Sequence, residues 1–254
     1  VATTFEEVKA QGDVFNNAAE NKFIMRFEAG NAYTMQFFLT ANGYQLFGAD
    51  HTDPNAINFD SEEAIAGLEY FKSMQEYLPV PYADLTTDTV EVEFGKGTVP
   101  YVIVGPWAIS EIKNTADFEW GITTIPTING VQPLTFSGNI IASISAYTQH
   151  PDEARQVLEY MISDEGLEIL YKVRGAIPAL QDPTVIDGLS DDAYVMGVLE
   201  QAQFSEPMPS IPEMASFWAP AETMYRSVWE GLATPQEAAT KAMSDYEQAL
   251  LLVQ

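Results

Sequence analysis

The sequence predicts an α/β fold, because short apolar runs typical of buried strands alternate with segments of helical periodicity. The run TVPYVIVGPW (98–107) is almost continuously apolar, as expected of a strand that is covered on both faces. The segment FDSEEAIAGLEYFKSMQEYL (59–78) repeats apolar residues every three or four positions, as expected of an amphipathic helix. The chain has 254 residues, 46% of them hydrophobic, which suffices for one large domain or two smaller ones.

The strands are expected within residues 1–146. Thr4 and Glu7 have the spacing of a capping box at a helix start. Gly43 should end a later helix, because glycine readily adopts the left-handed conformation of helix ends, and Asp60 or Ser61 should cap the next one. The expected elements are helices at 3–12, 33–47 and 59–78 and strands at 21–29, 98–107, 120–127 and 138–146.

The second half is expected to be mainly helical. Thr234 is placed to cap the last helix, with Pro235 at its first position and Glu237 completing a capping box. The expected helices are a consecutive pair at 151–170, one at 191–203, one from about residue 214 and one at 234–252. The first helix of the pair should bury a face made of Ala154, Val157, Leu158, Met161 and Ile162.

The charge of the chain restricts its partners. There are 37 acidic residues against 11 Lys and Arg, a formal net charge of −26. Binding of nucleic acid or anionic lipid needs clustered Lys and Arg, so we expect neither. An anionic ligand is disfavoured as well, whereas neutral and cationic ligands stay open. High charge also keeps a protein soluble, which suffices to explain it.

No group of residues indicates catalysis, a metal ion or a cofactor. The chain has no cysteine, which excludes thiol nucleophiles, disulfides and thiolate metal sites. His51 and His150 stand in or beside loops, and no G-x-S-x-G elbow is present. The segment 50–60 is rich in oxygen ligands but lacks the spacing of a calcium loop, so structural calcium there is a less favoured alternative. GKG at 95–97 lacks the spacing of a phosphate loop.

The segment EPMPSIPEMASFW (206–218) combines three prolines with large apolar side chains. Proline has no amide donor and clashes with a preceding helical turn, so the first part of this segment should be extended. A disordered linker rarely carries so many large apolar groups. The segment therefore holds Met208, Met214, Phe217 and Trp218 at fixed places, either in the core or at a site.

Several motifs, in one consistent order, resemble those of the maltose/maltodextrin-binding proteins, the extracellular solute-binding subunits of bacterial ABC sugar importers. TTFEEV is similar to the family's T-W-E-E, and FGKGTVPYVIVGPWAISEI to F-x-K-G-x-x-A-M-x-x-x-G-P-W. HPDEARQVLEYMISDEGLEIL resembles P-x-x-x-A-x-x-F-L-x-x-x-x-T-D-E-G-L-E, and MPSIPEMASFW resembles M-P-N-I-P-Q-M-x-x-F-W. GNAYTMQFFLTANGY is similar to the loop and helix before the family's G-Y turn. The resemblance covers nearly the whole chain.

The resemblance implies a periplasmic-binding-protein-like fold of type II, with two α/β lobes around a ligand cleft. Residues 1–140 would form the first part of the C-terminal lobe, and 191–254 its second part with the C-terminal helices. Residues 141–190 would cross over and complete the N-terminal lobe. Most of that lobe is expected to be missing from this chain, so that the crossing segment lacks its usual sheet partners.

The resemblance also implies ligand-binding residues. The aromatic residues matching Tyr33, Trp107 and Trp218 stack on successive pyranose rings in the family, and the methionine matching Met208 lines the same cleft. A pyranose has an apolar C–H face that suits a rigid aromatic ring. The remaining two positions, Asn31 and Glu222, depart from the family's usual carboxylate and arginine. Asn31 could replace the carboxylate, or Glu28 could reach into the cleft instead.

The expected function is therefore non-catalytic binding of maltooligosaccharides for delivery to the membrane permease of an ABC transporter. The alternatives are a binding protein for a different oligosaccharide or a polyol, a glycosidase with paired carboxylates, and a purely structural surface domain. The expected partners are the sugar, the permease and the missing N-terminal lobe, and the protein should be a monomer. We expect it outside the cell, lipid-anchored or in the periplasm. VATTFEEVKAQGD is not a signal peptide, so the targeting segment is expected to be absent from the chain.

Overall fold

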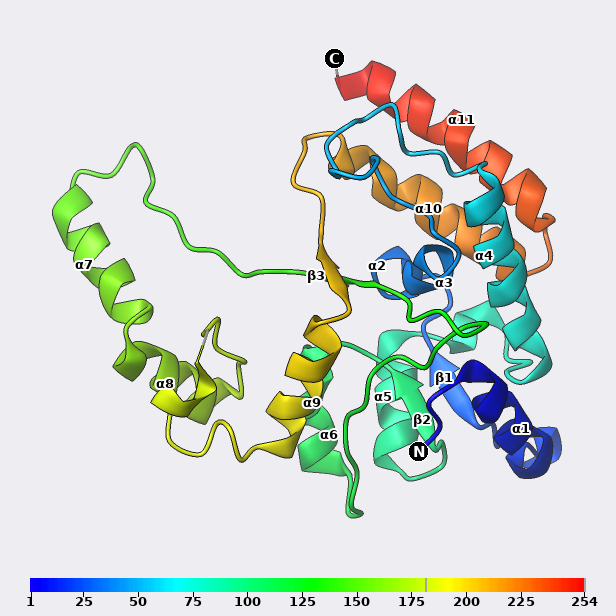
Figure 1. Cartoon of the computed structure of the whole chain (residues 1–254), viewed down its shortest axis with the longest axis horizontal. Helices are drawn as coiled ribbons and strands as arrows, with labels where there is room; N and C mark the ends of the chain where they lie inside the picture. Colours follow the sequence, from blue (N-terminus) through cyan, green and yellow to red (C-terminus); the bar gives the residue numbers. More distant parts are fainter. Residues whose placement is uncertain (181, 254) are drawn as a thin grey trace.

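The strands pair in two parallel couples, as a computed structural model that describes residues 1–180 and 182–253 shows (Figure 1). β1 (Met25–Phe27) pairs with β2 (Tyr101–Ile103), and β3 (Thr135–Ser137) pairs with β4 (Ser205–Pro207). Each couple joins segments far apart in the sequence, with helices in the connection. Parallel pairing through helical crossovers is the α/β arrangement that the sequence predicts.

The helices begin where the sequence predicts their caps. Thr4 Oγ1 accepts the Glu7 amide at 3.0 Å, Ser61 Oγ accepts the Ala64 amide at 3.2 Å, and Thr234 Oγ1 accepts the Glu237 amide at 3.2 Å. The helices are α1 (Phe5–Phe15), α2 (Ala32–Met35), α3 (Phe37–Thr40), α4 (Glu62–Ser73), α5 (Thr87–Gly95), α6 (Ile109–Thr115), α7 (Pro151–Met161), α8 (Asp164–Arg174), α9 (Ala193–Ala202), α10 (Met214–Trp229) and α11 (Pro235–Val253).

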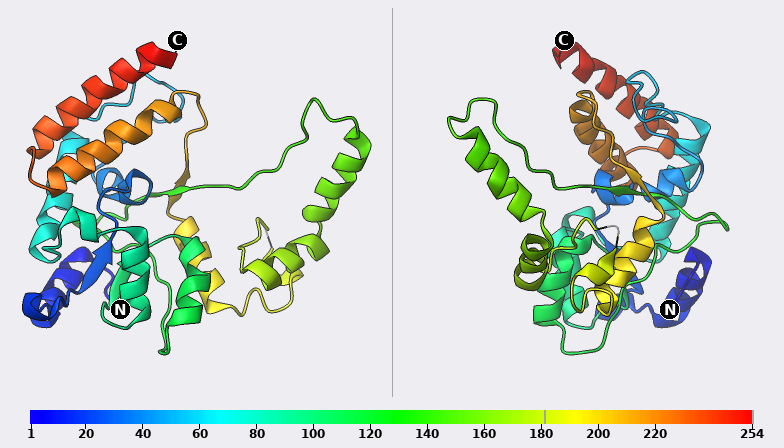
Figure 2. Two further views of the ribbon diagram at one scale, coloured as in Figure 1. Left: turned by 180° about the vertical axis from the view of Figure 1, so that it is seen from behind. Right: turned by 60° about the vertical axis from the view of Figure 1, so that its left-hand side comes forward.

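Aromatic side chains fill the core of the main body. Phe71 of α4 is fully buried, and its ring centroid lies 5.3 Å from that of Tyr225 and 5.1 Å from that of Trp229, both on α10. Phe27 of β1 reaches the same cluster, with its ring 5.5 Å from that of Trp229. α10 and α11 lie side by side over this cluster (Figures 1 and 2). The strand β1 and the helices α4 and α10 are thereby fixed to one another.

The helix expected at 33–47 is divided in the structure. α2 and α3 are separated at Gln36, and the turn after them contains Gly43 at φ +89°. α3 ends at Thr40, three residues before the predicted stop, and Gly43 adopts the predicted left-handed conformation in the turn that follows. The division places Tyr33 on its own short helix, which contacts β3.

An arm made of residues 138–180 extends away from the main body (Figures 1 and 2). The strand expected at 138–146 is wrong, because this segment pairs with no described strand and the side chains of Ile140 and Ile141 stand in solvent. α7 follows as predicted, but its expected buried face is wrong, since Val157 is 59% and Ile162 is 72% exposed. The arm therefore carries apolar surface that the described chain leaves uncovered.

The strand expected at 120–127 is also wrong. The segment runs as an irregular chain, with a single bridge between Thr4 and Thr127. Its polar backbone groups bond elsewhere, since the Ile125 amide donates to the side chain of Gln201 at 2.7 Å. In the described part of the chain, no helix is long and apolar enough to cross a membrane.

Candidate ligand-binding site

Four aromatic rings from four different elements form a continuous row. The ring centroid of Tyr33 on α2 lies 6.2 Å from that of Trp107, which follows β2, and 5.7 Å from that of Phe136 on β3. Phe136 in turn lies 6.5 Å from Trp218 on α10. The structure thus brings together three rings that the sequence predicted for the site. Phe136 links them and was not predicted.

Trp107 is the exposed member of this row. It lies in a short 3-10 helix, Pro106–Ala108, and 54% of its surface is open to solvent. Ala108, directly after it, is buried with Ile112 and Phe94. A large aromatic ring held by a buried neighbour and open on one side is suited to receive a flat apolar ligand surface.

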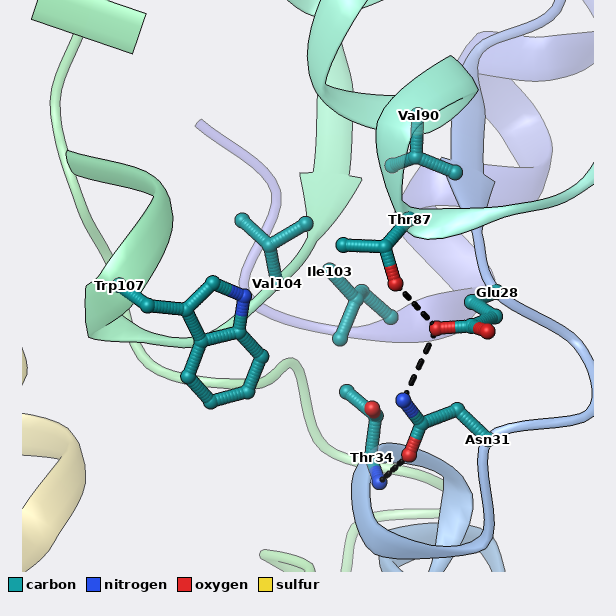
Figure 3. A pocket seen from close by; sticks show the side chains of 8 residues that line it. All are labelled: Glu28, Asn31, Thr34, Thr87, Val90, Ile103, Val104 and Trp107. Carbon is teal, nitrogen blue, oxygen red and sulfur yellow. Dashed lines mark hydrogen bonds between the residues drawn. The ribbon is translucent and has the colours of Figure 1, made fainter. Parts of the chain in front are cut away.

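A small hollow lies beside Trp107. Figure 3 shows the indole on one side of the hollow and a group of polar side chains on the other. Its lining combines apolar and polar side chains: Glu28, Asn31, Thr34, Thr87, Val90, Ile103, Val104 and Trp107. A ligand lying across the mouth of the hollow would meet an aromatic face and hydrogen-bonding groups together.

The polar side is organised around the carboxylate of Glu28. Its Oε2 accepts a hydrogen bond from Asn31 Nδ2 at 2.9 Å and another from the hydroxyl of Thr87. Asn31 Oδ1 in turn accepts the amide of Thr34 at 3.0 Å and caps α2 (Figure 3). Both polar ends of Asn31 are engaged within the protein, and Glu28 Oε2 already accepts two hydrogen bonds. Acceptor capacity beside the hollow is therefore shared by the Glu28 carboxylate and the hydroxyls of Thr34 and Thr87.

The other predicted site residues, Met208 and Glu222, lie on elements that pair with or carry members of the row. Met208 follows β4 and is 37% exposed, and its amide donates to the Ser137 carbonyl at 3.2 Å. Glu222 is exposed on α10, one turn after Trp218. Burial raises the pKa of Tyr82, Arg226 opposes part of the rise, and the charges of Glu28, Glu222 and Glu230 add to it.

Burial affects the charged groups near the aromatic row. Burial raises the pKa of Glu91 on α5, and repulsion from Asp88 and Glu111 raises it further, while the Trp107 indole N–H opposes part of the rise. Burial likewise raises the pKa of the Tyr33 phenol. Tyr33 therefore stays neutral and able to donate a hydrogen bond.

The two histidines stay outside this site. His51 Nδ1 lies 2.9 Å from the Leu46 carbonyl oxygen, and its Nε2 lies 3.6 Å from Oε2 of the buried Glu206 on β4. His150 is exposed and precedes α7. Across residues 1–180 and 182–253, no three His, Asp or Glu side chains are grouped as metal ligands.

Comparisons with known proteins identify the family of the chain. The family described as bacterial extracellular solute-binding protein matches residues 2–193. The maltooligosaccharide ABC transporter solute-binding lipoprotein of Streptococcus pneumoniae (strain ATCC BAA-255 / R6) is 26% identical over 249 residues, 93% of this chain and 59% of that protein. The galactooligosaccharide-binding protein of Bacillus subtilis (strain 168) is 25% identical over 217 residues, 83% of this chain and 51% of that protein.

A solved structure shows the same fold. The crystal structure of a cyclo/maltodextrin-binding protein complexed with maltotetraose matches with a TM-score of 0.83 and 31% identity, over 98% of this chain and 64% of that chain. This confirms the predicted periplasmic-binding-protein-like fold class and the resemblance to maltodextrin-binding proteins. The chain spans 59% of the length of the Streptococcus pneumoniae relative. Since the family match covers most of its residues and the fold agrees, the chain belongs to the bacterial extracellular solute-binding proteins.

Proposed function

We propose that the protein binds maltooligosaccharides without chemical turnover and delivers them to an ABC importer. The observation that carries this proposal is the pairing of the exposed Trp107 ring with the Glu28 carboxylate across one hollow. A pyranose has an apolar face for the ring and hydroxyl groups at its rim for the carboxylate. The names of the Streptococcus pneumoniae relative and of the matched crystal structure support this class of sugar.

The row of rings favours a ligand of several sugar units. Trp107, Tyr33 and Trp218 belong to one chain of ring contacts through Phe136, so successive units have successive apolar surfaces. We include Met208 and Asn31 in the proposed site, Asn31 as the residue that holds Glu28 in place. Glu222 is proposed at its outer edge, beside Tyr82. No catalytic residue, cofactor or metal is part of the proposal.

The arm that extends from the main body (Figure 1) supports the proposed division into lobes. Residues 1–140 and 191–254 would form one lobe, and 141–190 would belong to a second lobe. Solvent-exposed apolar side chains on α7, on α8 and between them support this division, because an apolar face of that kind requires a partner surface. They include Val157, Ile162 and Val173. The N-terminal lobe is the proposed partner surface.

Closure of two lobes around the sugar would create the form that a membrane permease recognises. We propose a monomer that acts outside the cell, either lipid-anchored or in the periplasm. The family description and the word lipoprotein in the name of the Streptococcus pneumoniae relative support this location.

A different oligosaccharide is the second candidate ligand. The Bacillus subtilis relative is named for galactooligosaccharides, and its identity to this chain, 25%, is close to the 26% of the maltooligosaccharide relative. An aromatic ring can pack against the apolar face of either kind of sugar, and a carboxylate can accept hydrogen bonds from the hydroxyls of either.

Calorimetric titration of the complete natural protein separates these candidates. The panel is maltose, maltotriose, maltotetraose, cellotriose and a galactooligosaccharide. The proposal predicts an affinity that rises from maltose to maltotriose and no heat with cellotriose. The sugars should be recovered without hydrolysis after the titration. Preference for the galactooligosaccharide would favour the second candidate, and no binding across the panel by a folded protein would contradict both.

A further inference from the structure

The ring of Trp107 occupies the space in which any side chain at position 105 would begin. A Cβ atom built on Gly105 would lie 2.0 Å from Cζ3, 2.2 Å from Cη2 and 2.4 Å from Cε3 of Trp107. These atoms belong to the six-membered part of the indole. Real Cβ atoms do not approach other atoms this closely, so the ring fills the space beside the Gly105 backbone that a side chain would need.

The backbone at this position does not itself require glycine. Gly105 has φ −90° and ψ 177°, an extended conformation that alanine adopts without strain. Its carbonyl accepts the amide of Ala108 at 3.1 Å, a bond that alanine would also make. Among these features, only the ring of Trp107 excludes a side chain.

We propose that Gly105 is a positioning residue for ligand binding, because its missing side chain forms the recess that holds the Trp107 ring against the hollow. This inference rests on the proposed function. Trp107 is half-exposed, with the buried Ala108 on one side and the ring of Tyr33 6.2 Å away. The recess holds the Trp107 ring in one position before the sugar binds. The ring therefore loses little conformational entropy on binding.

Gly105→Ala tests the inference without straining the fold. The three atoms nearest to the added methyl group all belong to the far end of the exposed Trp107 side chain, so the ring should swing out while the chain stays folded. We expect the affinity for maltotetraose to fall about tenfold or more, close to the loss in Trp107→Ala. The near-ultraviolet circular dichroism of the tryptophans should change as well, in the absence of any sugar.

The double variant Gly105→Ala/Trp107→Ala shows whether Gly105 acts through the ring. The inference predicts that the double variant has the sugar affinity and the near-ultraviolet circular dichroism of Trp107→Ala alone, because the two changes remove the same contact. Gly121→Ala is the matched control, since Gly121 is exposed and a Cβ there would meet nothing within 4 Å. It should behave like the natural protein.

Two results would overturn the inference alone. The first is that Gly105→Ala keeps the natural affinity and spectrum while Trp107→Ala binds weakly. The second is that adding Gly105→Ala to Trp107→Ala lowers the affinity further. Natural affinity in Trp107→Ala would overturn the proposed site, and the inference with it. The failures of the two proposals are therefore distinguishable.

Discussion

The ring centroids of Tyr33 and Trp107 lie 6.2 Å apart, with ring planes inclined by 54°. One ring comes from a short helix after β1 and the other from the turn after β2, which pairs with β1 in parallel. The carboxyl ends of neighbouring parallel strands meet at one edge of a sheet, and ligand sites in α/β proteins lie at that edge. The paired strands thus bring the two rings together.

Replacing Phe136 should weaken ligand binding indirectly, through the rings that it supports. Phe136 is buried and contacts both Tyr33 and Trp218, so Phe136→Leu should let both rings shift. We expect unfolding to become easier by about 1–3 kcal/mol and affinity to fall several-fold, measured by urea denaturation and calorimetry. Phe71→Leu, deep in the core, is the control. It should lose similar stability and keep its affinity, and equal affinity losses in both variants would refute a specific role for Phe136.

Removing the charge of Glu28 should weaken binding while the fold persists. Glu28→Gln keeps the shape of the side chain but replaces one acceptor oxygen with a donor, and hydrogen bonds to a charged acceptor contribute about 1.5–3 kcal/mol. We expect calorimetry to show about a tenfold loss or more in affinity. Glu69→Gln changes an exposed carboxylate on α4 and should have no effect on binding. Unchanged affinity in Glu28→Gln would remove this carboxylate from the site.

Glu206 should make stability depend on pH in a particular direction. Burial raises its pKa above the usual value of 4.5, and the nearby His51 opposes part of the rise. The folded protein therefore holds this proton at pH values where the unfolded chain has lost it, and the free energy of unfolding falls as the pH rises from 4.5 through the raised pKa. Other carboxylates add their own dependence, so the comparison must be with a variant.

Glu206→Gln removes this contribution. Chemical denaturation of the natural protein and the variant at several pH values should show a smaller loss of stability in the variant over this window. Glu69→Gln serves as the control and should follow the natural protein. Parallel curves for the natural protein and Glu206→Gln would show that Glu206 titrates alike in the folded and unfolded states.

The capping residue Thr234 should contribute to stability without affecting the site. Its hydroxyl accepts the Glu237 amide, and Glu237 in return accepts the Thr234 amide at 2.9 Å. Thr234→Ala should cost about 1 kcal/mol in thermal or urea denaturation. Thr240→Ala, at an exposed position inside α11, should cost nothing, because alanine is the better helix former. Equal effects of the two changes would contradict the assigned cap.

The local parts of the fold could be predicted from the sequence. The starts at Thr4, Ser61 and Thr234 depend on side chains within three residues of the cap, so a short stretch of sequence contains all the information. Strands depend on distant partners. The apolar segment 138–146 has the composition of a strand, but pairing requires a neighbour that the described chain does not place beside it.

The site was predictable only in part, for a related reason. Tyr33, Trp107 and Trp218 stand in recognisable motifs, whereas Phe136 ends the mixed segment VQPLTF (131–136), whose pattern gives no sign of its two ring contacts. Asn31 was predicted as a direct ligand group, and its side chain turns out to bond Glu28 and the start of α2. Asn31 directly precedes the first residue of α2, and asparagine is a preferred N-cap residue, so the sequence did contain a signal for this capping role.

The most direct test of the central claim is the affinity of the complete natural protein for maltotetraose with and without its two proposed tryptophan platforms. Trp107→Ala and Trp218→Ala should each weaken binding at least about tenfold, while Val14→Ala, an exposed apolar change on α1, should leave it unchanged. Circular dichroism would show that all variants are folded. Natural affinity in both tryptophan variants would contradict a sugar site on these rings.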